Sequence, residues 1–117
     1  MPKHRQERLT KEILHEISLL LQDKVKDPRL TAVTVTDVSV SPDLRLATVY
    51  FTVLGGADER DAAMNGLVSA LPFLRRELAQ SLQMRLAPDL RFVYDSAWEE
   101  GFRIEQLLEQ LKKDAES

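Results

Sequence analysis

The sequence has 117 residues, of which 44% are hydrophobic and 30% charged, and its net charge is −3. This length and composition predict one globular domain, neither a pair of domains nor a disordered chain. The absence of cysteine excludes disulfide bonds, thiol nucleophiles and thiolate zinc sites. The opening stretch MPKHRQERL lacks the apolar segment of a secretory signal, and no apolar run approaches the ~20 residues of a membrane span. We therefore expect a cytoplasmic protein with no membrane association.

Charge is distributed unevenly along the chain. Residues 95–117 carry seven acids and three bases, whereas residues 1–94 carry twelve acids and thirteen bases. Residues 1–29 and 75–91 each have a net charge of +2, and residues 30–74 have one of −3. Two mildly basic patches could therefore face a phosphate backbone. On charge alone, an ordinary solvated surface is the better explanation.

The first half of the chain predicts a helix and a hairpin. Apolar residues at spacings of three and four indicate a helix over 5–25, which ends before Pro28. Alternating patterns indicate strands over 32–40 and 45–54. The valines of the first strand change phase after Val35, which predicts a β-bulge near residues 36–37. The sequence Ser41-Pro42-Asp43-Leu44 predicts a tight turn between the two strands.

The second half predicts a long helix over 59–82 with Asp58 as its N-cap. Pro72 lies inside this helix and cannot donate to the carbonyl of Val68, so we expect a kink or a split into a helix pair. A strand over 90–95 follows. Ser96-Ala97-Trp98-Glu99 then has the form of a capping box, which predicts Ser96 as the N-cap of a last helix that runs to about residue 113. The ends, residues 1–4 and 114–117, are expected to be flexible.

This order of elements predicts a single two-layer α+β domain over residues 1–117. The helices are expected to pack on one face of a three-stranded sheet, because the strands have one continuous apolar face. The opposite sheet face carries Thr48, Tyr50 and Thr52 and is expected to be more exposed.

No reactive constellation is visible. The sequence lacks the P-loop, dinucleotide-binding, nucleophile-elbow and HExxH patterns. His4 and His15 are the only histidines, and no third ligand is in prospect, so we expect no metal and no cofactor. Paired acids at helix starts are explained by the helix macrodipole. The sequence therefore predicts no catalytic residue and no enzyme.

Basic side chains gather in two places. One group lies at the start of the first helix and the other follows the expected kink; they comprise Lys3, Arg5, Arg8 and Lys11, and Arg75, Arg76 and Arg85. Arginine suits bidentate phosphate contacts, and a helix that restarts after a kink would offer N–H groups to an anion. The alternative is that these arginines solubilise a helix and pair with acids such as Glu77. From these positions alone, the alternative is favoured.

A resemblance to a known family makes RNA contact the favoured explanation of these basic residues. The sequence contains, in this order, VTVTDVSVSPDL (33–44), ATVYFTV (47–53), ALPFLRREL (70–78), LQMRLAPDLRFVYD (82–95) and EGFRIEQLL (100–108). Together with Arg8, Glu16-Ile17 and DPRL (27–30), this ordered set resembles the bacterial ribosome-binding factor A family over residues 5–111.

The resemblance implies a KH-like (type II) domain with the order α-β-β-α(kinked)-α-β and an extra C-terminal helix. The family's characteristic feature is an interrupted helix with the sequence Ala-x-Gly, which replaces the GxxG loop of other KH domains. Ala70 matches the alanine of this pattern. Pro72 stands at the glycine position, which affects any role that depends on the small size of glycine.

The resemblance also implies a function. Members bind the immature 30S ribosomal subunit and its 16S rRNA and promote late maturation and rRNA 5′-end processing, especially during cold adaptation. On this basis we expect a monomer without enzymatic activity, whose release involves an assembly GTPase or initiation factors. The expected RNA-binding residues are Lys3, Arg5, Arg8, Lys11, Ala70, Pro72, Arg75, Arg76 and Arg85. The alternative is a protein–protein interaction module that docks through its acidic last helix near Trp98 and Phe102, with RNA contact incidental.

Overall fold

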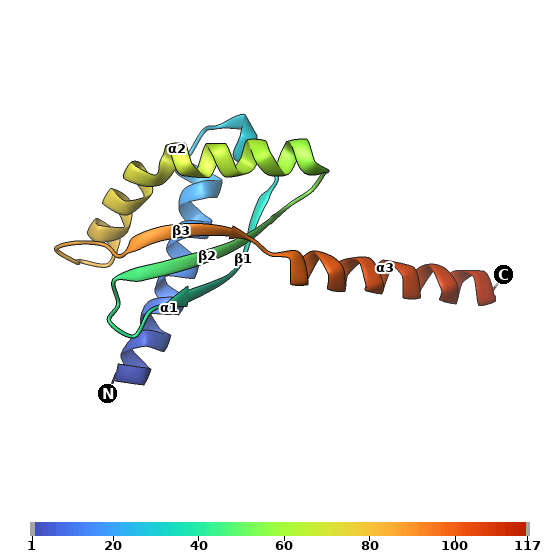
Figure 1. The fold of residues 1–117 in the computed structure, drawn as a ribbon, viewed down its shortest axis with the longest axis horizontal. Helices are drawn as coiled ribbons and strands as arrows, with labels where there is room; N and C mark the ends of the chain where they lie inside the picture. The colour runs from blue at the N-terminus through green and yellow to red at the C-terminus, as the bar shows by residue number, and fades with distance from the viewer. Residues whose placement is uncertain (1, 117) are drawn as a thin grey trace.

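The computed structural model describes the backbone of residues 2–116 and the side chains of residues 5–116. Its elements are, in chain order, α1 (Pro2–Leu19), η1 (Leu20–Lys24), η2 (Pro28–Leu30), β1 (Val33–Val40), β2 (Leu46–Val53), α2 (Ala57–Ser81), β3 (Asp89–Tyr94) and α3 (Ser96–Glu116). The α+β class and the element types that the sequence predicts are confirmed (Figure 1). Residues 2–4 and 114–116, expected to be flexible, are helical here, and residues 1 and 117 fall outside the described range.

The sheet has the order β1-β2-β3, in which β1 and β2 are antiparallel and β2 and β3 are parallel. The expected bulge is present, because the register shifts between Val35 and Asp37 and leaves Thr36 without an opposite residue. The extra residue returns the later valines, Val38 and Val40, to the face that Val35 occupies. The apparent phase slip in the sequence therefore keeps one apolar face.

The turn between β1 and β2 is held by its own polar groups. The N–H of Leu44 donates to the carbonyl of Ser41 at 2.9 Å, which closes a four-residue turn. The carboxylate of Asp43 accepts from the Ser41 hydroxyl at 2.7 Å and from the N–H of Arg45 at 3.1 Å. The hairpin predicted from Ser-Pro-Asp-Leu is thus confirmed.

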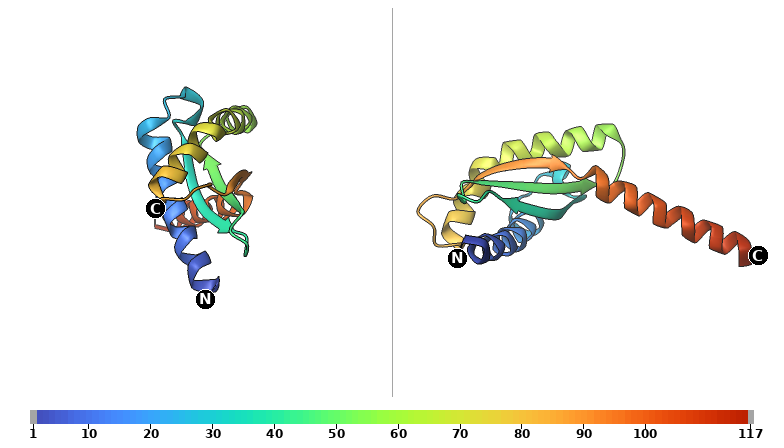
Figure 2. Two further views of the ribbon diagram at one scale, coloured as in Figure 1. Left: turned by 90° about the vertical axis from the view of Figure 1, so that its left-hand side faces the viewer. Right: turned by 60° about the horizontal axis from the view of Figure 1, so that its bottom comes forward.

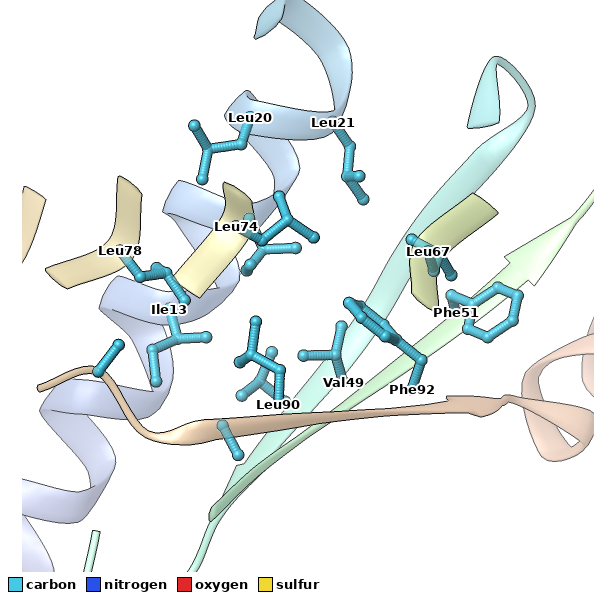
Figure 3. Close-up of a cluster of buried hydrophobic side chains, with 14 of the residues drawn as sticks. Ile13, Leu20, Leu21, Val49, Phe51, Leu67, Leu74, Leu78, Leu90 and Phe92 are labelled. Carbon is cyan, nitrogen blue, oxygen red and sulfur yellow. The ribbon is translucent and has the colours of Figure 1, made fainter. Parts of the chain in front are cut away.

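Helices α1 and α2 cover one face of the sheet and enclose the core (Figures 1 and 2). Figure 3 shows Ile13 of α1, Leu67 and Leu74 of α2, and Phe51 and Phe92 of the sheet pointing into one cluster. The first three of these side chains and that of Phe51 are fully buried. The helical spacing of apolar residues therefore marks the helix faces that the sheet covers.

Helix α2 is continuous from Ala57 to Ser81, so the expected split into two helices is wrong. The expected kink is present, since the two halves of α2 run in different directions (Figures 1 and 2). Pro72 is exposed while Leu74 and Leu78 are fully buried. Packing of the second half on the sheet keeps the helix intact around the missing hydrogen bond, and the strain is relieved as a bend.

The start of α2 differs from the expectation. Its N-cap is Gly56 and not Asp58, because the chain already becomes helical at Ala57. The Glu59 carboxylate accepts from the N–H of Gly56 at 2.9 Å, which is the half of a capping box that needs no side chain at the N-cap. Further along, a Cβ on Gly66 would lie 3.0 Å from Cδ2 of Leu30. The glycine therefore allows α2 to approach η2 closely.

Helix α3 leaves the end of the sheet and projects from the rest of the molecule (Figure 1). Asp95, not Ser96, caps its N-terminus: its Oδ1 accepts from the N–H of Trp98 at 2.9 Å. The first turns of α3 lie beside the end of β2, where Trp98 and Thr52 line the same hollow. Thr52 is consequently buried, so the expectation that it lies on an exposed face is wrong, whereas Thr48 and Tyr50 are half-buried. In the part of the chain that the structure describes, no helix is long and apolar enough to cross a membrane.

Candidate nucleic-acid interface

The cations of α1 lie on two sides of that helix. Arg5 and Arg8 line a groove of about 470 Å³ together with Leu44 of the β1–β2 turn and residues 81–84 at the end of α2. Lys11 lines a different hollow, against β1. Arg8 forms an ion pair with Glu12 at 3.2 Å. The side chain of Lys3 lies outside the described residues.

The elements that line this groove are the first half of α1, the β1–β2 turn and the end of α2. They lie at the end of the molecule opposite α3 (Figure 1). Arg85 follows directly on Met84, the last of the residues that line this groove, and is exposed. Glu12 and Glu16 also line the groove. Their negative charges largely offset the positive charges of Arg5 and Arg8 there. The sequence groups Arg85 with Arg75 and Arg76, whereas the fold puts it next to the groove of Arg5 and Arg8, and the sequence does not show that acids accompany these two arginines.

The bent helix α2 separates the two adjacent arginines. Successive helical residues point about 100° apart, so Arg75 and Arg76 cannot share one direction. Arg75 reaches Asp89 at the start of β3, where its Nη2 lies 2.9 Å from Oδ1, and also the carbonyl of Ala87 at 3.5 Å. Arg76 is exposed one turn after Pro72 and has no ion-pair partner among residues 2–116. Arg76 is therefore available to a phosphate, whereas Arg75 already has an anionic partner.

A hollow of about 270 Å³ lies beside Ala70 on the other flank of α2. It is lined by residues of α2 and of the segment between α1 and β1, namely Gly66, Ser69, Ala70 and Phe73, and Lys24, Val25, Lys26 and Asp27. Lys24 lies 3.8 Å from Glu77, and Lys26 is exposed with no ion-pair partner in the described chain. The hollow thus combines a small-residue floor at Ala70 with a basic rim.

Lys24 and Lys26 are the residues that sequence reasoning missed. Their place beside Ala70 depends on the close packing of η2 against α2 at Gly66. The sequence signal was the count of bases in residues 1–29, which includes both lysines but does not show what they face. Lys24, Lys26 and Ala70 line this hollow, whereas Pro72 and Arg76 are exposed residues on the adjoining solvent side of α2. We name these five residues together the α2 face.

The electrostatics around the α2 face are fixed by short-range pairs. Asp27 accepts from the Arg29 guanidinium, with Oδ2 2.7 Å from Nη2, and from the backbone N–H of Arg29 at 3.0 Å. The side-chain hydrogen bond to Arg29 lowers the pKa of Asp27 below its ordinary value and raises that of Arg29. Asp27 is therefore ionised and paired with Arg29. Because Lys24 lies close to Glu77, the positive charge that remains without an ion-pair partner on this side is that of Lys26.

The α2 face carries lysine and arginine side chains. Among the side chains of residues 5–116, no group of three or more histidine, aspartate or glutamate residues is placed to hold a metal ion. Arginine and lysine beside a shallow hollow can hold phosphates and leave room for a flat group next to Phe73. Of the nine predicted residues, the α2 face contains Ala70, Pro72 and Arg76, Arg75 lies on its β3 flank, and the others described lie at or near α1.

The three-stranded sheet covered on one face by α1 and a bent α2 defines the chain as a KH-like α+β domain. The match to a family model is more specific: residues 5–108 match that of ribosome-binding factor A. The chain belongs to the ribosome-binding factor A family.

Relatives and solved structures agree with this assignment. Ribosome-binding factor A from Geotalea uraniireducens is 47% identical over 107 residues, which cover 91% of this chain and 88% of that one. Ribosome-binding factor A from Staphylococcus carnosus is 41% identical over 113 residues, which cover 97% of this chain and 98% of that one. The crystal structure of ribosome-binding factor A from Thermus thermophilus is similar with a TM-score of 0.61 and 28% identity, over 80% of this chain and 94% of that one.

Proposed function

We propose that this protein binds the immature 30S ribosomal subunit and its 16S rRNA and promotes late maturation, including rRNA 5′-end processing, especially in the cold. The observation that carries the proposal is a structural neighbour described as Thermus thermophilus ribosome-binding factor A fitted into a cryo-EM map of a 30S complex. That neighbour covers 80% of this chain with a TM-score of 0.59. The α2 face supplies the chemistry that such binding needs.

In this proposal the protein acts by holding RNA and not as an enzyme. Arg76 and Lys26 contact phosphates of the RNA backbone. Arg75 binds a further phosphate once that phosphate has replaced Asp89 as its ion-pair partner. Arg5, Arg8 and Arg85 supply a second phosphate-contacting surface at the opposite end from α3, and Lys3 and Lys11 add phosphate contacts elsewhere on α1. Pro72 keeps the bend rigid where the family has glycine. The protein works as a cytoplasmic monomer and a single domain over residues 1–117, without a cofactor, and an assembly GTPase takes part in its release.

The test is complementation of a bacterial strain that lacks its own ribosome-binding factor A. Primer extension at low growth temperature measures the fraction of 16S rRNA that keeps its precursor 5′ end. The wild-type protein should lower this fraction, and R75E/R76E should not, because two phosphate contacts become repulsive. R45E/R91E, which reverses two exposed arginines outside the proposed RNA-binding residues, is the matched control and should behave like wild type. If wild type and the empty vector gave the same fraction of precursor, the processing role would be refuted.

A further inference from the structure

Helix α3 carries an apolar stripe that no other element covers. Ile104, Leu107, Leu108 and Leu111 follow at helical spacings of three and four, and between 51% and 65% of each residue is exposed. No residue of α3 is buried. Figures 1 and 2 show α3 extending from the end of the sheet with no other helix or strand beside its second half.

The base of α3 is attached firmly to the body. Besides capping the helix, Asp95 accepts from the hydroxyl of Thr36 in the β1 bulge, and its N–H donates to the carbonyl of Phe51 at 2.7 Å. Glu99 accepts from Arg60 of α2 at 3.4 Å, and that guanidinium lies 3.9 Å from the centroid of the Tyr94 ring. The stripe is therefore presented in a defined direction.

The aromatic residues of α3 belong to this attachment and not to the stripe. Trp98 and Phe102 stack with centroids 5.4 Å apart and line the hollow at the end of β2, with Leu54. By helical periodicity they lie on a different side of α3 from Leu107 and Leu111. The stripe is thus a separate surface, free of contact with the body.

Charge decides what can cover the stripe. Residues 95–117 carry seven acids and three bases, a net charge of −4. An RNA backbone would be repelled by this segment, and so would the same segment of a second copy. A basic protein surface is the occupant that complements both the apolar stripe and the surrounding acids.

We propose that the α3 stripe docks on a lysine- and arginine-rich protein of the small ribosomal subunit, in an apolar groove with a basic rim. The proposal rests on the proposed function and adds a protein contact to the RNA contact of the α2 face. Residues at i, i+3, i+4 and i+7 are the anchors of helix-in-groove recognition, and Ile104, Leu107, Leu108 and Leu111 have this spacing. Acids that flank the stripe, such as Glu100 and Glu105, would pair with the rim.

The decisive variants are L107S/L111S and a matched control, Q106S/Q110S. Both change two exposed positions four residues apart, and both replace good helix formers by serine, so the loss of helix propensity is similar. Binding is measured by sedimentation of the full-length proteins with purified, salt-washed small subunits. Removal of two apolar anchors should weaken binding by about tenfold or more, and the control should remain within about twofold of wild type.

Photo-crosslinking identifies the partner. The full-length protein carries p-benzoylphenylalanine at position 107, or at position 106 as the control, and is irradiated on purified small subunits. Crosslinks from position 107 to one identified basic ribosomal protein support the proposal. Crosslinks to rRNA, or none while the protein is bound, overturn it.

A second measurement separates this inference from the proposed function. The small-subunit proteins, individually purified and free of rRNA, are tested for binding to wild type and to both double variants. Retention of a basic protein by wild type and Q106S/Q110S, with loss in L107S/L111S, supports the proposal. Failure of wild type to sediment with subunits would refute the proposed function; failure to retain any of these purified proteins would refute the docking role of α3.

Discussion

The difference between Arg75 and Arg76 leads to a quantitative prediction. The substitution Arg76→Gln removes a cation that has no ion-pair partner among the described residues, whereas Arg75→Gln removes one that already contacts Asp89 at 2.9 Å. Each phosphate contact contributes about 0.7–0.9 to the slope of log K against log salt concentration. At about 0.15 M salt, loss of one contact therefore weakens binding by roughly fivefold. We expect this loss for Arg76→Gln.

Arg75 should contribute less. Its side chain is 43% exposed and that of Asp89 is 72% exposed, so their pair is a surface ion pair, worth about 0.2–1 kcal/mol. A phosphate must replace this partner, which offsets most of the gain from the new contact. Arg75→Gln is therefore expected to weaken binding by at most about threefold at the same salt concentration.

Fluorescence titration of labelled protein with purified small subunits, at salt concentrations from about 0.05 to 0.3 M, measures both the affinity and the slope. Arg103→Gln on α3 is the control, because Arg103 pairs with Glu99 at 3.8 Å and lies away from the α2 face. Its slope should equal that of wild type. The reasoning is refuted if Arg76→Gln leaves the slope unchanged while Arg75→Gln lowers it.

Three further predictions concern the fold. Gly66→Val should lower the free energy of unfolding, measured in urea, by about 1–3 kcal/mol, because the valine side chain would collide with Leu30. Gly101→Ala is the control and should not lower it, because no atom lies within 4 Å of a Cβ at that position. Asp95→Ala should speed amide hydrogen exchange in the first turns of α3, because it removes the N-cap. Thr36→Val removes only the other hydrogen bond to Asp95 and should speed exchange less. Equal exchange rates in the two variants would contradict the capping role. The Ser41 hydroxyl lowers the pKa of Asp43 below its ordinary value of 3.8, and hydrogen bonds from backbone N–H groups lower that of Glu59. A lowered folded-state pKa stabilises the fold above the unfolded-state value, and this stability is lost as pH falls through the folded-state value; Tm should therefore drop below about pH 4, and Asp43→Asn should make that drop shallower.

The spacing of apolar residues along the sequence predicts most of the fold, because the core is built from residues that recur with the periods of helices and strands. The leucines and isoleucines of α1, the valines of β1 and the turn at Ser41–Leu44 each follow one local rule, and the structure confirms each of them. The bulge was visible because a residue inserted in a period of two changes the phase of every later side chain. Helix ends were less predictable: Gly56 and Asp95 cap α2 and α3 in place of Asp58 and Ser96.

The candidate site was less predictable because it depends on contacts between distant segments. The sequence places Arg75 and Arg76 together, but their different directions on α2 give one of them Asp89 as a partner, 14 residues along the chain. Lys24 and Lys26 reach Ala70 only because Gly66 lets η2 approach α2. The continuity of α2 through Pro72 is likewise a tertiary effect, since buried Leu74 and Leu78 stabilise the second half.

The central claim is that this protein binds the small ribosomal subunit during its assembly. Sucrose-gradient fractionation of a lysate from bacteria that produce it, followed by detection of the protein across the gradient, tests this claim most directly. The account predicts that the protein migrates with free small subunits and not with translating ribosomes. Its absence from all ribosomal fractions, at low as well as ordinary growth temperature, would contradict the account.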